Sequence, residues 1–321
     1  MVPASTFQGG KQAFGRGVLG ICRDFALGLV DWVKIRLANM TAPLGLVDLE
    51  TLVSHVSARS LLALPSNVST EFSGVSMVGT RALIRKNVKG LHLVAVPSTG
   101  LQSDLLIGAG CVDSLQTGSI LLYEYGRANR FFEAQKAGTL KIKDSTCPAI
   151  HAGLIAAEKG LPFMPVRGLI GSDVLRHRMA EDGWYCIDNP FAKDDPIVVV
   201  PPIRPDVCLL HVPLADQFGN VWIGRRSEFA TMARASNKTL VTFEEIFDGD
   251  LMAAEDKTPA TIPALYITAL SHQPKGAWPL HGGRAYVEDA AHLRKYAEMS
   301  KTKAGFADYL AQFVLDVNEA A

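Results

Sequence analysis

Cysteine is scarce in this sequence. Its 321 residues include five cysteines, an odd number, and no two of them form a CxxC pair. A disulfide framework needs paired cysteines, and a structural zinc site needs closely spaced ones, so neither is expected. We therefore expect a protein of the reducing cytoplasm in which most of these side chains are small core residues. The cysteines are Cys22, Cys111, Cys147, Cys186 and Cys208.

The chain also lacks an excess of charge of either sign. Lys and Arg total 32, and Asp and Glu total 32, so the formal net charge is zero. Without a net positive field, binding to nucleic acid or to an anionic membrane has no general electrostatic support. A hydrophobic content of 48% excludes an intrinsically disordered chain. The low net charge suits a component of a larger assembly.

No uncharged hydrophobic run is long enough to span a membrane, which takes roughly 20 residues. In the apolar stretch 17–40, the charges also do not precede the hydrophobic part, as they would in a secretory signal. We therefore expect neither a membrane span nor a cleaved signal here. The interrupting residues are Arg23, Asp24, Asp31, Lys34 and Arg36.

The apolar residues of this stretch recur at helical spacing, which predicts an amphipathic helix. Docking on the same domain or on a sister subunit is the commoner arrangement, and lying at a membrane surface is the alternative. A third hypothesis is that translation begins at Met40. We therefore separate an N-terminal extension, residues 1–45, from one domain formed by residues 46–321.

Several catalytic signatures are missing. The sequence contains neither GxxxxGK[ST] nor a GxGxxG after an apolar strand, so ATP and dinucleotide binding lose their usual signal. No HExxH motif is present, so the sequence does not indicate a catalytic metal. No GxSxG motif is present either, so it does not indicate an α/β-hydrolase. We expect no permanently bound cofactor.

Short apolar runs do alternate with helix-like segments from residue 46 onward. Such alternation predicts an α/β fold, an open and mostly parallel sheet flanked by helices, with the ligand site at the carboxyl ends of the strands. The expected strands are 91–97, 104–107, 119–123, 139–142, 162–166, 197–200, a hairpin over 207–224, and 239–246. The expected helices are 48–63, 79–87, 129–137, 149–159 and the tail 287–317.

Four loops at expected strand ends are rich in small residues: 68–77, 96–104, 121–127 and 166–173. Small residues let backbone N–H groups approach a ligand carbonyl or phosphate, although glycine is also an ordinary turn residue. Glu124 follows an apolar run in one of them. It could act in catalysis, or it could pair with Arg127 or Arg130, which is the commoner arrangement because structural ion pairs outnumber catalytic carboxylates.

The order of four segments resembles the α subunit of class I coenzyme A transferases, in particular the branch of the glutaconate CoA-transferase α chain. The most specific piece is HVPLADQFGN, with His211, Ala215, Asp216, Gly219 and Asn220 as its pattern. GAGCV and GLPFMP precede it in the right order. The similarity covers roughly residues 46–313, and its segments are 104–115, 153–173, 205–224 and 286–299.

The resemblance implies the CoA-transferase fold, a β-subunit partner in a heterodimer or heterotetramer, and an acyl-CoA thioester as substrate. It also implies a ping-pong transfer in which a β-subunit glutamate attacks the thioester. This chain has no ENG or ESG motif of the β type. Alone it should therefore be inactive.

Within this framework the loops supply the candidate site. We expect Glu124 to be catalytic, and the substrate to contact Glu71, Phe72, Ser73 and Gly74, then Ser98, Thr99 and Gly100, and finally Gly168, Gly171 and Asp173. For the last group a turn is an equal alternative, with Ser172 or Asp173 capping the following helix.

Two departures from the family leave other functions open. The loop reads STEFSGVSM where relatives have a glycine pair, and KIKDSTCPAI retains only Asp144 where relatives often have an acidic cluster. The second hypothesis is a CoA-thioester hydrolase that opens rings of steroid-derived or other cyclic acyl-CoA compounds on the same fold. The third is a catalytically dead binding module.

Overall fold

The computed structural model describes residues 45–66 and 72–316 of the chain. The helix expected within 17–40, the possible start at Met40 and the candidate Glu71 lie outside these residues. The described part falls in the second of two units, Leu44–Ala321. Within that part, no helix combines the length and the apolar character that crossing a membrane would take.

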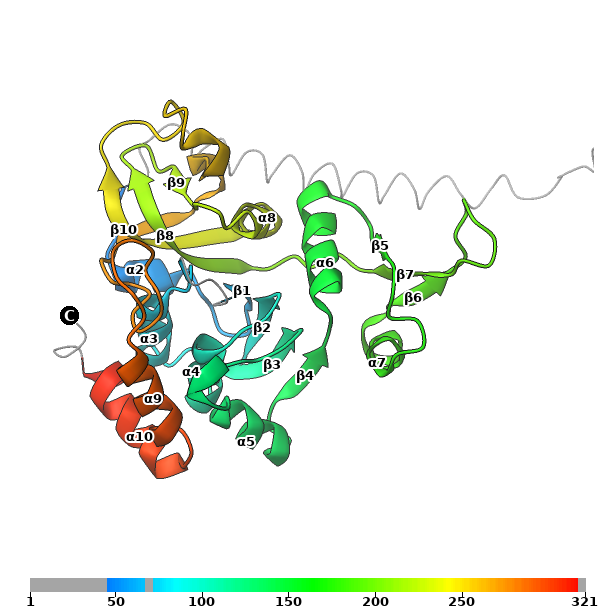
Figure 1. Cartoon of the computed structure of the whole chain (residues 1–321), viewed down its shortest axis with the longest axis horizontal. Helices are drawn as coiled ribbons and strands as arrows, with labels where there is room; N and C mark the ends of the chain where they lie inside the picture. Colours follow the sequence, from blue (N-terminus) through cyan, green and yellow to red (C-terminus); the bar gives the residue numbers. More distant parts are fainter. Residues whose placement is uncertain (1–44, 67–71, 317–321) are drawn as a thin grey trace, which may run out of the picture. The chain divides into compact units, whose positions relative to one another are not determined.

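A parallel sheet forms the centre of the fold (Figure 1). Its strands run in the order β12-β10-β8-β1-β2-β3-β4, and the short strands β9 and β11 add an antiparallel extension next to β8. The expected α/β architecture is confirmed. The bounds are β1 Leu61–Pro65, β2 Leu91–Val96, β3 Val112–Thr117, β4 Lys141–Asp144, β8 Val207–Asp216, β9 Val221–Trp222, β10 Lys238–Phe247, β11 Thr261–Ile262 and β12 Ala269–His272.

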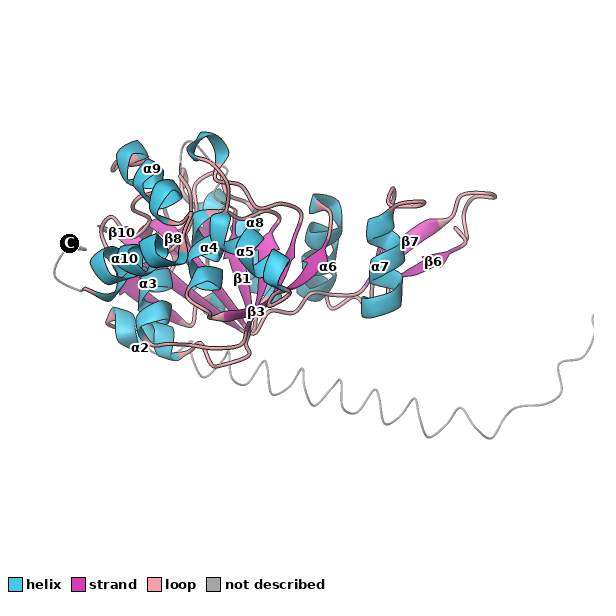
Figure 2. Ribbon diagram, turned by 90° about the horizontal axis from the view of Figure 1, so that it is seen from below, coloured by secondary structure: helices cyan, strands magenta, loops and turns pink. Residues whose placement is uncertain are grey.

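Helices cover the sheet because successive strand residues point to opposite faces. Leu62 and Leu64 enter one core, whereas Ala63 enters the other. Figure 2 shows the strands flanked by helices. The first core is covered by α2 Leu49–Ser54, α3 Met77–Arg85, α4 Leu101–Gly108, α5 Asn129–Ala137, α9 Ala290–Met299 and α10 Lys303–Leu310. The second is covered by α6 Cys147–Lys159 and α8 Glu228–Ala235.

Capping residues set the ends of α6. The hydroxyl of Thr146 accepts a hydrogen bond from the N–H of Ala149, and Gly160 takes a left-handed conformation after the last turn. The helix expected over 149–159 is thus confirmed, as are those near 79–87 and 129–137. Single turns of other helix types are η1 Tyr123–Tyr125, η2 Thr258–Ala260, η3 Ala264–Tyr266 and η4 Ala311–Leu315.

A small second sheet lies between α6 and β8 in sequence. It consists of β5 Met164–Val166, β7 Ile197–Val200 and β6 Tyr185–Ile187, all antiparallel, together with α7 Asp173–Asp182. Leu175, Trp184 and Val198 form its own core against α6. In Figure 1 this unit projects beyond α6, away from β1 and β2.

Three expectations about local structure were wrong. Residues 104–107 lie within α4, which is buried on nearly all sides and so has no polar face to mark it as a helix. The helix expected over 48–63 ends at Ser54, and its last apolar run is β1. Residues 119–123 are no strand, since Tyr123 has a φ of 51° and turns the chain into η1.

Candidate active site

The carboxyl ends of β1 and β2 meet at one edge of the sheet. Ser66, directly after β1, has its hydroxyl 2.8 Å from that of Ser98, which follows β2. The N–H of Thr99 donates to the carbonyl of Ser119, and the Thr99 hydroxyl lies 2.7 Å from that of Ser103. Gly100 is the N-cap residue that directly precedes α4. The structure therefore brings the second predicted group, Ser98 to Gly100, next to the loop that follows β1.

The loop formed by residues 72–76 lies beside them. Its Ser73 N–H donates to the carbonyl of His281 at 2.9 Å. The buried guanidinium of Arg226 donates to the carbonyls of Phe72, Ser73 and Ser66 at 2.7–2.8 Å. A cation surrounded by three carbonyls fixes the path of the main chain here. The predicted residues Phe72, Ser73 and Gly74 are thus joined to Ser98 through Ser66.

A narrow pocket of about 40 Å³ opens at this edge. Tyr125 and Glu288 meet there, and the phenol donates to the carboxylate, which raises the pKa of Tyr125 to about 12. His281 lines the pocket as well. Its Nδ1 accepts a hydrogen bond from the N–H of Gly283, so the ring proton is on Nε2. The lining residues are Ser73, Leu101, Leu122, Tyr123, Tyr125, Leu280, His281, Glu288, Leu293 and Tyr296.

Glu124 is exposed and lies in η1, between two residues that line the pocket. Among the described residues we find no ion pair between it and Arg127 or Arg130, so the expected pairing was wrong. Arg127 instead lies over the ring of Phe132, and Arg130 is buried against Phe306. The catalytic role of Glu124 stays a prediction.

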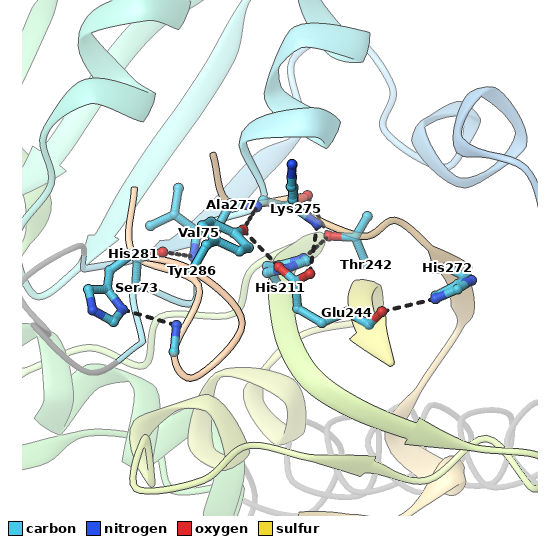
Figure 3. Close-up of polar contacts among 12 residues, drawn as sticks. Ser73, Val75, His211, Thr242, Glu244, His272, Lys275, Ala277, His281 and Tyr286 are labelled. Atoms are coloured by element: carbon cyan, nitrogen blue, oxygen red, sulfur yellow. Dashed lines mark hydrogen bonds and ion pairs between the residues drawn. The ribbon is translucent and has the colours of Figure 1, made fainter. Parts of the chain in front are cut away.

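Behind the pocket lies a buried polar network (Figure 3). His211 is fully buried on β8, and its ring nitrogens lie 2.8 Å from the Thr242 hydroxyl and 2.7 Å from the Glu244 carboxylate. Glu244 also accepts from the Tyr286 hydroxyl and from the N–H of Lys275, both at 2.7 Å. Sequence reasoning found His211 within the HVPLAD motif. It missed Glu244, Tyr286 and His281, which no local pattern marks.

The third predicted group lies elsewhere. Gly168 and Gly171 have φ values of 85° and 81° in the loop before α7, in the small unit. The hydroxyl of Ser172 caps α7 by accepting from Leu175 N–H, and Asp173 pairs with Arg176 at 2.8 Å. The turn alternative with Ser172 as the cap is confirmed. The structure does not bring these residues together with Ser98, and their contact with substrate stays a prediction.

A larger hollow of about 760 Å³ lies between the small unit and the strand starts. Its charged groups largely neutralise one another, because Asp182 pairs with both Lys143 and Arg178, and Lys141 pairs with Glu181. In the described ranges, no cluster of three or more His, Cys, Asp or Glu residues is suited to a metal ion. The edge formed by β1, β2 and the 72–76 loop is therefore the candidate site.

The chain is similar in sequence to several proteins of known function. The A chain of glutaconate CoA-transferase from Acidaminococcus fermentans is 30% identical over 233 residues, 67% of this chain and 72% of that protein. The A chain of 3-oxoadipate CoA-transferase from Pseudomonas knackmussii is 28% identical over 247 residues, 75% of this chain and 84% of that protein. The cholesterol ring-cleaving hydrolase IpdA subunit of Rhodococcus jostii is 26% identical over 246 residues, 74% of this chain and 82% of that protein.

The similarity extends to three dimensions. The crystal structure of glutaconate coenzyme A-transferase from A. fermentans superimposes with a TM-score of 0.74 at 25% identity, covering 85% of this chain and 89% of that one.

An uncharacterized protein of Archaeoglobus fulgidus is 31% identical over 252 residues, and this chain spans 54% of its length. No protein-family model matches the chain.

The fold and these similarities define an α/β enzyme component of the CoA-transferase class. By identity and coverage, the chain belongs to the family of CoA-transferase α subunits. The resemblance predicted from the four ordered segments is confirmed.

Proposed function

We propose that this chain is the α subunit of a heteromeric enzyme that transfers coenzyme A between carboxylic acids, in the cytoplasm. The observation that carries the proposal is the 30% identity to the corresponding chain of a glutaconate CoA-transferase, over a fold whose strand-end loops surround a pocket. The β subunit would complete the site and supply the nucleophilic glutamate. No cofactor would be bound permanently, since the acyl-CoA is the substrate.

The chemistry follows a covalent route. The β-subunit glutamate uses its carboxylate to attack the thioester carbonyl, forming an acyl anhydride and releasing CoA thiolate. The thiolate then attacks the glutamyl carbonyl of the anhydride, giving a glutamyl-CoA thioester and the free donor acid. An acceptor carboxylate reverses both steps and leaves as the new acyl-CoA. Splitting one transfer into such steps works only if the carboxylates are held close together.

For the substrate we propose a short acyl chain that carries a second polar group. The relatives are named for glutaconate and 3-oxoadipate, which both have two carboxylates. In the pocket, the Nε2–H of His281 would donate to such a group, while Leu101, Leu122 and Leu280 would contact the carbon chain. Ser98, Thr99 and Gly100 would line the thioester end.

The first test is dependence on the partner. The purified chain should exchange no labelled CoA between an acyl-CoA and an acceptor acid, whereas its complex with the β subunit should do so. The reason is that the nucleophile belongs to the partner. Label transfer is read by chromatography of the CoA esters. Full exchange by the chain alone would exclude the proposed division of labour.

A hydrolase on the same fold is the second candidate, favoured by the position of Glu124 beside the pocket and by the 26% identity to a ring-cleaving hydrolase chain. The two candidates predict different results for Glu124→Gln. In the transferase the β-subunit glutamate is the nucleophile and Glu124 would only orient the substrate, so we expect kcat to fall by about tenfold or less. In a hydrolase that uses this carboxylate, kcat should fall by about a hundredfold or more.

Product analysis completes this comparison. Acyl-CoA consumed without an acceptor acid would favour the hydrolase, and strict dependence on the acceptor would favour the transferase. The third hypothesis, a binding module without activity, would be favoured only if calorimetry found no CoA ester bound, with the β subunit or without it.

A further inference from the structure

His211 connects two loops that lie far apart in the sequence. Its main-chain N–H donates to the carbonyl of Gly74 at 2.9 Å, and its ring stacks on that of Phe72, with centroids 5.7 Å apart. On the other side the ring lies against Gly276, where an added Cβ would come within 2.6 Å of Cε1. The histidine is therefore fitted between the 72–76 loop and the segment 273–286.

The polar groups around the His211 ring determine that its Nε2 carries a proton. Glu244 is surrounded by donors, because Lys275 N–H and the Tyr286 hydroxyl both point to its carboxylate. Burial alone would raise the pKa of Glu244, but hydrogen bonds from His211, Tyr286 and Lys275 hold it below the usual value. The ionised carboxylate accepts from Nε2–H of His211, and Nδ1 lies 2.8 Å from the Thr242 hydroxyl.

The network continues to both loops. The hydroxyl of Ser76, at the end of the 72–76 loop, lies 2.8 Å from that of Thr242. The two loops are also bonded directly, from Ser73 N–H to the His281 carbonyl at 2.9 Å, and Val78 N–H, at the start of α3, donates to the Gly276 carbonyl at 2.9 Å. Three residues of these segments, Ser73, Leu280 and His281, line the pocket. Figure 3 shows His211, Glu244 and Tyr286 converging behind that wall.

We infer that His211 and Glu244 are positioning residues that hold the 72–76 loop and the 273–286 segment in register and so set the shape of the acyl pocket. Both are buried and neither lines the pocket. They act on the substrate only through Ser73 and His281. The expected change in kcat/KM rests on the proposed function, whereas the expected loosening of the two segments does not.

The test compares His211→Phe with His92→Phe. Phenylalanine keeps the ring but removes both nitrogens, which leaves Glu244 and Thr242 without that partner. His92 is the control, because it lies on β2, two strands away from β8 in the same sheet, with its Nδ1 2.8 Å from the hydroxyl of Ser114, outside the site. Amide hydrogen exchange of the full chain is measured by mass spectrometry, with melting temperature alongside.

For His211→Phe we expect exchange in peptides covering 72–79 and 273–286 to accelerate by about tenfold or more, with the rest of the sheet unchanged. In the complex with the β subunit, kcat/KM for the acyl-CoA should fall by at least about tenfold. His92→Phe should leave both segments and the kinetics within about twofold. Acceleration throughout the sheet, or none in the two segments, would overturn the inference.

Two milder variants keep the test decisive if His211→Phe does not fold. Tyr286→Phe removes one hydroxyl from the network, and Glu244→Gln keeps the shape but can no longer accept from all three donors. Both should accelerate exchange in 273–286 and lower kcat/KM by less than His211→Phe does. Unchanged kcat/KM with loosened segments would overturn the link to catalysis. A wild-type complex without any CoA transfer would instead refute the proposed function, while the exchange pattern would still decide the positioning role.

Discussion

Replacing Arg226 by alanine is expected to lower the free energy of unfolding by about 3 kcal/mol or more. The guanidinium is buried and donates to the carbonyls of Ser66, Phe72 and Ser73, and its Cζ lies 4.6 Å from the centre of the Phe229 ring. Alanine would leave three acceptors without their donor in a place that water reaches poorly. Urea unfolding of the full chain measures the change.

The same substitution should impair activity more than its effect on stability explains. Two of the three carbonyls, those of Phe72 and Ser73, belong to the 72–76 loop, so kcat/KM of the complex should fall by at least about tenfold even at temperatures where the variant is folded. Arg226→Lys should recover little, since one ammonium cannot reproduce the fork of donors.

Arg234→Ala is the matched control for Arg226. Arg234 also belongs to the α8 region and lies over an aromatic ring, that of Tyr266, but its side chain is 38% exposed and pairs with Glu158 at 3.3 Å. The cost should stay below about 1 kcal/mol. Equal losses of unfolding free energy for Arg226→Ala and Arg234→Ala would show that the three carbonyl contacts contribute no more to stability than an exposed ion pair.

The sequence predicts strands well where an apolar run contains Val or Ile. β2 and β7 were located within one residue, because LHLVAV and IVVV are such runs, whereas β1, LLALP, has neither residue and resembles a helix. The prediction fails for β3, because most residues of its sequence, VDSLQT, are polar. Ser114 and Gln116 of that strand line the hollow beside the small unit instead of a helix-covered core. A polar face at such an opening resembles a loop when only the sequence is read.

The candidate site could be predicted in part for a similar reason. The loop after β2 is found from the end of a predicted strand, and parallel strands bring such ends together at one edge of the sheet. The partners of His211 cannot be found in this way. Glu244 and Tyr286 are 33 and 75 positions further along the chain. Glu244 reaches His211 through the pairing of β8 with β10, and Tyr286 reaches Glu244 through the return of the 273–286 segment.

Gly74→Ala should be among the most damaging single substitutions in the described chain. Gly74 has a φ of 71°, and an added Cβ would lie 2.0 Å from Cζ of Phe229. Phe229 is fully buried in the second core, so its ring has no free space to move into. The left-handed backbone costs alanine about 1 kcal/mol, and overpacking adds about 1–3 kcal/mol. We therefore expect a loss of about 3 kcal/mol, measured by urea unfolding.

Gly138→Ala separates the two contributions. Gly138 has nearly the same conformation, with a φ of 67°, at the end of α5, but nothing lies within 4 Å of its added Cβ. It should cost only about 1 kcal/mol. In addition, Phe229→Leu should partly relieve Gly74→Ala, so that the double variant is more stable than the sum of the two single losses predicts. Two results would contradict this argument: equal losses of stability for Gly74→Ala and Gly138→Ala, or strictly additive losses for Gly74→Ala and Phe229→Leu. Either result would mean that the 72–76 loop does not pack closely on Phe229. In that case α8 would not support the wall of the pocket.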